Sequence, residues 1–213
     1  ARGTLKRELT RHLRRARSRR YARSQSSKGQ GQGKLTGMVM ISERPPEVAD
    51  RAVPGHWEGD LLIGTRTNAI ATLVERQTRY CQLVALPEGT GAEEVADALK
   101  ASITTLPAQL RRSLTWDQGK EMSAHRRFSV ESGVEVYFCD PRSPWQRGSN
   151  ENTNGLLRQY FPKRMSLAGI GQERLDEVAE KLNGRPRETL GFATPADKLA
   201  ELIDRLEQAG TER

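Results

Sequence analysis

The sequence predicts an α/β fold, in which helices flank a mixed five-stranded sheet and a basic helical arm comes first. One observation behind this prediction is the order of periodic segments after residue 45, where strand-like apolar runs alternate with stretches of helical period. The other is charge. Of the 35 Lys and Arg residues, 12 fall within residues 1–34 beside a single acid, Glu8, whereas the other 26 of the 27 acids lie in the body.

Three apolar segments joined by short turns predict three consecutive antiparallel strands. An amphipathic helix follows, with Val95, Leu99 and Ile103 on one face. In chain order, the expected bounds are 56–64, 69–75 and 80–86 for strands, 91–105 for a helix, 114–116 for a strand, 122–132 for a helix, 134–138 for a strand, and 148–161, 172–182 and 196–208 for helices. This order of elements is the ribonuclease H-like arrangement.

The N-terminal arm is suited to nucleic acid. Leu5, Leu9 and Leu13 repeat every four residues, which predicts a basic amphipathic helix over residues 4–20. Basic side chains that neutralise phosphates release condensed counterions, so such an arm gives salt-sensitive affinity for DNA. The predicted contacts are Arg14, Arg15, Arg19 and Arg20, and the alternative is a solvated tail. Residues 24–37, rich in Ser, Gly and Gln, predict a flexible linker.

Three carboxylates are candidates for chemistry. Asp117 directly follows the apolar run 114–116, so we expect it at the carboxyl edge of the sheet, where ligands bind. Glu151 lies in the first turn of the helix expected over residues 148–161. Asp60 lies within the first strand on the same face as Glu58, and alternation alone does not choose between these two acids.

Four motifs in order resemble the integrase core of DDE transposases, most closely the thirty family of bacterial insertion-sequence transposases. They are HWEGD at residues 56–60, TWDQG at 115–119, SPWQRGSNENTNGLLRQYFP at 143–162 and NGRPRETLGFATPAD at 183–197. The resemblance implies an integrase catalytic core over residues 45–200. The arm and linker, 1–44, would follow a helix-turn-helix region outside this sequence, and 201–213 would form the helix end and tail. It assigns the catalytic and metal-binding roles to Asp60, Asp117 and Glu151.

Three neighbouring anions repel one another, so we expect cations to complete the site. Mg²⁺ or Mn²⁺ prefers oxygen ligands and retains water. Two such ions, about 3.5 to 4 Å apart, activate an attacking oxygen and stabilise a leaving one. The resemblance implies cleavage at transposon ends and then transfer of a DNA 3′-hydroxyl into target DNA, without a covalent enzyme intermediate.

Further side chains near these acids are predicted to contact DNA. Trp145 lies in a loop containing Pro and Gly, where we expect it to stack on a splayed base, with a lid over the core as the alternative. Arg147 is predicted to contact phosphate, and Asn154 to orient a ligand or to contact backbone phosphate. Arg158, Lys163 and Arg164 are predicted to contact the same DNA strand, and in the alternative interpretation they are ordinary surface charges.

Three functions remain open on the sequence. They are an active DDE transposase, a catalytically silent transposase-derived DNA-binding regulator, and a ribonuclease H-type nuclease. The intact acids favour the first over the second, and the basic arm favours it over the third.

The expected partners are double-stranded DNA, at terminal inverted repeats and at the target, and further copies of the chain. We expect a bacterial cytoplasmic protein at the nucleoid and no membrane partner, because no apolar run approaches roughly 18 residues.

Overall fold

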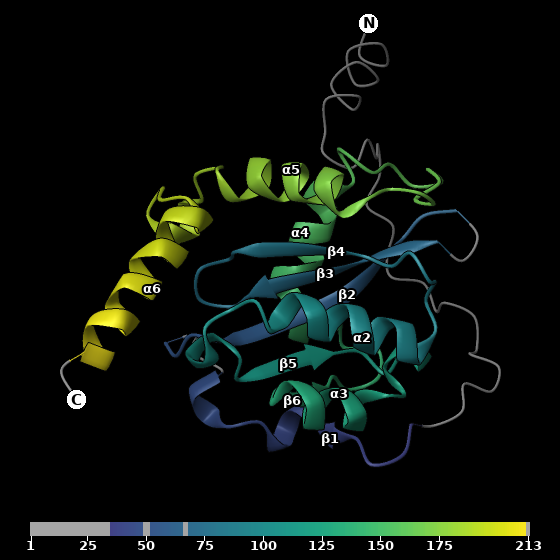
Figure 1. The fold of residues 1–213 in the computed structure, drawn as a ribbon, viewed down its shortest axis with the longest axis horizontal. Coiled ribbons are helices and arrows are strands. Elements are labelled where there is room, and N and C mark those ends of the chain that lie inside the picture. Colours follow the sequence, from purple (N-terminus) through teal and green to yellow (C-terminus); the bar gives the residue numbers. More distant parts are fainter. Residues whose placement is uncertain (1–34, 49–51, 66–67, 212–213) are drawn as a thin grey trace, which may run out of the picture. The chain divides into compact units, whose positions relative to one another are not determined.

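A six-stranded mixed sheet organises the part of the chain that this computed structural model describes, residues 35–48, 52–65 and 68–211. Its strands lie in the order β1-β6-β5-β2-β3-β4 (Figure 1). Their bounds are Val39–Met40 for β1, His56–Ile63 for β2, Ala69–Glu75 for β3, Cys81–Ala85 for β4, Ser113–Trp116 for β5 and Glu135–Phe138 for β6. β2, β3 and β4 pair antiparallel, whereas β5, β6 and β1 add in parallel.

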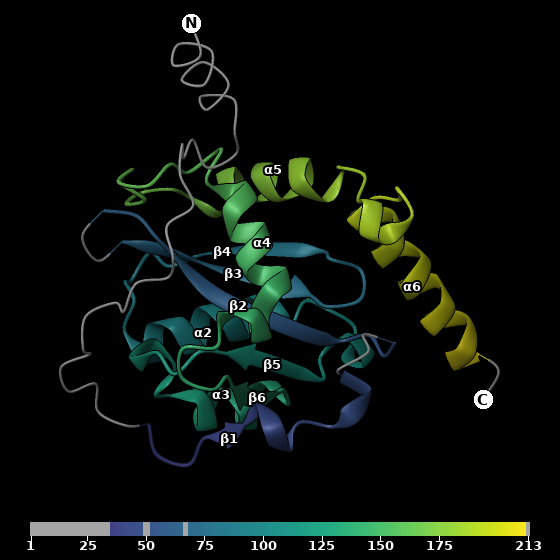
Figure 2. The ribbon, with the colours of Figure 1, turned by 180° about the vertical axis from the view of Figure 1, so that it is seen from behind.

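Helices cover both faces of the sheet. α2 (Ala92–Ile103) and α3 (His125–Ser132) lie on the face seen in Figure 1, whereas α4 (Gly148–Leu157) crosses the opposite face, as Figure 2 shows. α5 (Gln172–Asn183) packs with α4 against β2, β3 and β4 in a second apolar cluster. α6 (Pro195–Thr211) packs through Leu199 and Leu202 on Leu110, just before β5. Within the described residues, none of the helices has the length and apolar character needed to cross a membrane.

Strand β2 divides its side chains between the two layers by simple alternation. Trp57 is buried in the cluster with α2 and α3, and Leu61 packs against that cluster. Glu58, Asp60 and Leu62 belong to the opposite face, toward α4. The face that α4 meets is therefore charged at the start of β2 and apolar near its end.

Helix α4 matches this change of polarity along its length. Its buried residues in the first two turns are polar, Ser149, Asn150 and Thr153, and its buried residue in the last turn is Leu157. Leu157 packs in the same cluster as Leu62 of β2. The apolar contact of α4 with the core is thus confined to the C-terminal half of the helix. The helix also ends at Leu157, before the expected residue 161, and the chain continues through turns to Phe161, which is buried.

The body begins earlier than the sequence predicted. Five strands were expected and the described residues contain six, because Val39–Met40 pairs in parallel with β6. Two residues are too few to show a strand period, so this strand has no signal of its own. Residues from Leu35 onward group with the body, although residues 35–44 were expected to belong to the arm and linker. At the other end, α6 matches the helix expected over residues 196–208 and extends it by a few residues.

One close approach holds β2 against β5. A Cβ atom on Gly59 would lie 2.2 Å from the ring of Trp116, so only glycine leaves room for this indole. Trp116 is fully buried and donates its indole N–H to Glu121 Oε1 at 3.0 Å. The Gly before Asp60 and the Trp before Asp117 thus bring the two aspartate-bearing strands together.

Candidate active site

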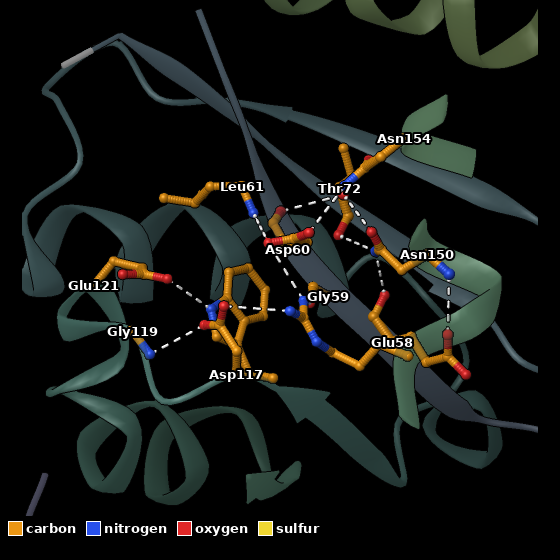
Figure 3. Close-up of polar contacts among 12 residues, drawn as sticks. Glu58, Gly59, Asp60, Leu61, Thr72, Asp117, Gly119, Glu121, Asn150 and Asn154 are labelled. Atoms are coloured by element: carbon orange, nitrogen blue, oxygen red, sulfur yellow. Dashed lines mark hydrogen bonds and ion pairs between the residues drawn. The ribbon is translucent and has the colours of Figure 1, made fainter. Parts of the chain in front are cut away.

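Asp60 and Asp117 meet at one place on the sheet. β2 and β5 pair in parallel, with Glu58 opposite Thr115. The same register, continued by two residues, sets Asp117 level with Asp60, and the period of two places both carboxylates on one face. Figure 3 shows Asp60 on β2 and Asp117 just after the neighbouring strand β5.

The Arg147 guanidinium joins the two aspartates. Its Nη1 lies 3.3 Å from Asp60 Oδ1, and its Nη2 donates to Asp117 Oδ2 at 3.2 Å. Nη1 also donates to the backbone oxygen of Gly59 at 2.6 Å. The arginine side chain is only 11% exposed, compared with 30% for Asp60 and 46% for Asp117. An arginine from the short helix before α4 thus occupies the space between the acids.

Asp60 is further held by neutral donors. The Leu61 N–H donates to Oδ1 at 2.9 Å, and Asn154 Nδ2 donates to Oδ2 at 3.1 Å, as Figure 3 shows. Burial raises the pKa of Asp60; Arg147 opposes this rise and the charge of Asp117 adds to it. Asp60 is therefore the more restrained acid of the pair, and the nearby positive charge of Arg147 favours its ionised form.

Glu151 lies next to this pair without joining it. Its side chain is exposed in the first turn of α4. Asn154, three residues later, lies on the same side of the helix and contacts Asp60. Among the described residues, no group of three or more acids, histidines or cysteines is arranged to hold a metal ion. The structure thus brings two of the three predicted acids together and places the third along the bordering helix.

Glu58, the other acid on this face of β2, has a separate set of partners. It is fully buried and forms an ion pair with Arg76. Its Oε2 accepts the backbone N–H groups of Ser149 and Asn150, at 2.8 and 3.0 Å. These donors are in the first turn of α4, where N–H groups have no partner within the helix and a negative charge is favoured. Glu58 therefore fixes the start of the helix that carries Glu151.

Asn150 completes this attachment, and the sequence analysis did not single it out. Its Nδ2 donates to the backbone oxygens of Glu58, at 2.8 Å, and Thr72, at 3.0 Å, and its Oδ1 accepts the Thr72 hydroxyl at 3.2 Å (Figure 3). A side chain of α4 is thereby bound to both β2 and β3. An Asn beside a helix N-terminus predicts capping, so no local signal indicated a bond to distant strands.

The predicted DNA contacts have different surroundings. Trp145 is 65% exposed, and Lys163 and Arg164 are exposed. Arg158 instead donates to the backbone oxygens of Ile63, at 3.0 Å, and Phe161, at 3.4 Å. Arg14, Arg15, Arg19 and Arg20 lie outside the described residues.

The donor atoms around the acid pair suit a hard divalent cation. Asp60 and Asp117 offer carboxylate oxygens, and the Asn154 Oδ1 atom is buried without a hydrogen-bond partner among the described residues. All of these are oxygen donors, the type that Mg²⁺ and Mn²⁺ prefer. Two acids and an amide therefore fit such an ion.

Comparisons with known proteins agree with this fold. The integrase core domain family matches residues 50–144. The chain is 18% identical to the catalytic core domain of bovine immunodeficiency virus (BIV) integrase in a crystal structure, with a TM-score of 0.52 over 72% of this chain and 98% of that one. At this identity the likeness shows the fold alone, and it confirms the predicted ribonuclease H-like class.

Sequence relatives are considerably closer. The chain is 50% identical over 203 residues to the transposase for insertion sequence element IS1086 of Cupriavidus metallidurans, a match that covers 95% of this chain and 59% of that protein. It is also 50% identical over 195 residues to transposase InsI for insertion sequence element IS30A of Escherichia coli, covering 91% of this chain and 50% of that protein. The chain spans only about half to three-fifths of the length of these relatives. It belongs to the integrase-core transposases, in the group that includes those of the insertion sequence elements IS30 and IS1086.

Proposed function

We propose that this chain forms the catalytic part of a transposase that cuts DNA at transposon ends and joins the resulting 3′-hydroxyl to target DNA. The observation that carries this proposal is that one guanidinium, that of Arg147, contacts both Asp60 of β2 and Asp117, which directly follows the adjacent parallel strand β5. The relatives bear the name transposase over the stretch that contains these residues. The reaction would take place on bacterial DNA in the cytoplasm, at the nucleoid.

In this proposal, Asp60, Asp117 and Glu151 hold divalent metal ions, Mg²⁺ or Mn²⁺, and two ions suit the chemistry best. Members of this family generally use divalent ions. When bound, the ions activate an attacking oxygen and stabilise the leaving oxygen of an in-line displacement. Water serves as the nucleophile in cleavage and a DNA 3′-hydroxyl in strand transfer, so one set of carboxylates serves both steps.

The chain's own residues position these groups. Leu61 N–H and Asn154 orient Asp60, and Gly119 N–H donates to Asp117 Oδ1 at 3.0 Å. Glu58 sets the start of α4 and hence the position of Glu151 along the sheet. Catalytic groups placed on strands and a helix are held more precisely than groups on loops.

DNA would lie along the exposed side of α4 and the turns that flank it. Trp145 is a free aromatic surface for stacking on a splayed base, and Lys163 and Arg164 are exposed for phosphate contact. The basic arm, with Arg14, Arg15, Arg19 and Arg20, would add salt-sensitive affinity. Terminal inverted repeats and target DNA are the proposed substrates, brought together by more than one copy of the chain.

The direct test compares substrates. Labelled duplex DNA and a labelled RNA/DNA hybrid are incubated with the protein in Mn²⁺, Mg²⁺ or EDTA, and nicked and strand-transfer products are separated on gels. The proposal expects metal-dependent nicking of duplex and joining of 3′-hydroxyl ends. Cleavage confined to the RNA strand of the hybrid would establish the nuclease instead. Binding of duplex without cleavage in either metal would favour the regulator.

A further inference from the structure

Arg147 is a cation already seated between the two aspartates. Its guanidinium contacts Asp60 Oδ1 at 3.3 Å and Asp117 Oδ2 at 3.2 Å from two different nitrogens. A divalent ion that uses the same oxygens needs the space between these carboxylates. The guanidinium and the ion therefore compete for one pair of anions.

The charges of the two aspartates stabilise the guanidinium in this position, but one of its nitrogens has no hydrogen-bond partner there. Although burial lowers the pKa of Arg147, Asp60 and Asp117 together raise it above its ordinary value. The Arg147 Nε atom, in contrast, is buried without a hydrogen-bond partner among the described residues. A buried donor without a partner costs about 1–3 kcal/mol, so the guanidinium is held by the two carboxylates and the Gly59 backbone oxygen and is destabilised at Nε.

The short helix that carries Arg147 also faces solvent. Pro144–Arg147 forms a single 3₁₀ turn, with Trp145 65% exposed and the Arg147 side chain 11% exposed. Gln146 ties this turn to Asp140, donating to its carboxylate at 2.8 Å and accepting its backbone N–H at 2.8 Å. A ligand that engages the outer side of the turn therefore acts on the same few residues that aim the guanidinium inward.

We propose that Arg147 is an exchangeable counter-ion of the acid pair, which holds Asp60 and Asp117 together before metal binds and transfers to a DNA phosphate when substrate arrives. The inference rests on the proposed function. Arginine binds carboxylate and phosphate with the same forked geometry, so a phosphate next to the acids is an equivalent partner. Transfer of the guanidinium frees the carboxylate oxygens, and DNA then strengthens metal binding.

This coupling is reciprocal by thermodynamic necessity. If DNA raises the affinity for metal by removing a competitor, metal raises the affinity for DNA by the same factor. Arg147 thereby offsets part of the negative charge of the metal-free site, and the protein binds its full complement of metal only when DNA is bound.

The first test measures Mn²⁺ binding without DNA, from the electron paramagnetic resonance signal of free Mn²⁺. Arg147→Gln removes the competing charge and is expected to bind Mn²⁺ more tightly than the wild type, by between about 5- and 150-fold, the usual span of such couplings. Arg147→Lys, which keeps the charge but not the fork, is expected to lie between them. Arg127→Gln removes an equal charge from α3, where Arg127 pairs with Asp97 and Glu93, and should match the wild type.

The second test measures DNA affinity by fluorescence anisotropy, with and without Ca²⁺ as a non-catalytic ion. Ca²⁺ is expected to tighten DNA binding by a larger factor in the wild type and in Arg127→Gln than in Arg147→Gln. Equal factors in all three proteins would overturn the transfer to phosphate.

The outcomes separate this inference from the proposed function. Asp117→Asn should lose Mn²⁺ binding. If it does, and Arg147→Gln binds Mn²⁺ no more tightly than the wild type, the counter-ion role is wrong and the metal site remains. If Asp117→Asn binds Mn²⁺ as well as the wild type, the metal site itself is misplaced. Thermal unfolding of each variant shows whether the fold is retained, and Arg147→Lys still decides the case if Arg147→Gln does not fold.

Discussion

Single residues on one face of β2 divide between anchoring and chemistry. Glu58 is fully buried and paired with Arg76, whereas Asp60, two residues later, is partly exposed and faces Asp117 through Arg147. Both carboxylate oxygens of Glu58 are bound by protein groups. Asp60 shares the Arg147 guanidinium with Asp117, and this shared pair is the place proposed for a metal ion.

Replacing Glu58 tests the anchoring role. Glu58→Gln breaks the buried ion pair with Arg76 and removes the charged acceptor of the α4 N-terminus, so we expect the free energy of unfolding to fall by about 3–5 kcal/mol. Urea unfolding measures this change. Glu58→Gln with Arg76→Gln should recover part of the loss, because both charges of the buried pair are then removed together. A loss below about 0.5 kcal/mol in the single variant, as for an ordinary surface substitution, would show that Glu58 does not anchor the helix.

The positions of these residues could be predicted from the sequence, but their separate roles could not. Alternation placed Glu58 and Asp60 on one face but could not choose between them, because both are carboxylates at equivalent positions. The burial that separates them arises from α4, which is some ninety residues away along the chain. Arg147 was predicted to contact DNA. Its position in the sequence indicates a positive charge near the acids, but it does not show that the side chain points back toward them.

At the scale of elements, the pairing of β2 with β5 places the acid pair. The parallel register runs from His56 opposite Ser113 to Glu58 opposite Thr115, and two further residues along each chain lead to Asp60 and Asp117. The sequence indicated both strands through their apolar runs, and only the register was missing. β1 could not be found because it has two residues, and the end of α4 was overestimated because Phe161 continues the apolar pattern beyond the helix.

The start of this strand pair contains a histidine that resists protonation. His56 Nδ1 lies 2.7 Å from Ser113 Oγ, and the ring is buried. Burial, reinforced by Arg112, Arg44 and Arg76, lowers the pKa of His56 from 6.5 to about 4. As the pH falls, His56 is therefore protonated in the unfolded chain before it is protonated in the folded protein. The folded protein favours the neutral ring.

This predicts a defined loss of stability in acid. Because the folded pKa lies below the unfolded one, the contribution of His56 is full above pH 6.5 and declines as the pH falls toward about 4, by up to about 3 kcal/mol. Urea unfolding of the wild type and His56→Gln at several pH values measures it. The stability advantage of the wild type over His56→Gln should shrink across this window. Parallel curves for the two proteins would contradict the prediction.

At the scale of the whole body, the sheet separates two tasks. α2 and α3 pack one face with an apolar cluster that includes Trp57, Trp116 and Phe128, whereas the other face carries the acids beside α4. Apart from β1, the layered order of strands and helices could be predicted from the sequence, because the longer segments have a clear period. The polar attachment of α4 did not, because it depends on contacts between segments far apart in the chain.

The central claim is that Asp60, Asp117 and Glu151 act together in metal-dependent cleavage. The most direct measurement is nicking of labelled duplex DNA in Mn²⁺ by Asp60→Asn, Asp117→Asn and Glu151→Gln, with DNA affinity measured in parallel. The matched controls are Asp204→Asn on α6 and Glu173→Gln on α5, both at exposed positions. We expect cleavage to fall by at least about 100-fold in each of the first three, with DNA binding retained, and to be unchanged in both controls. Cleavage by Asp117→Asn or Glu151→Gln at the rate of the wild type would contradict the assignment.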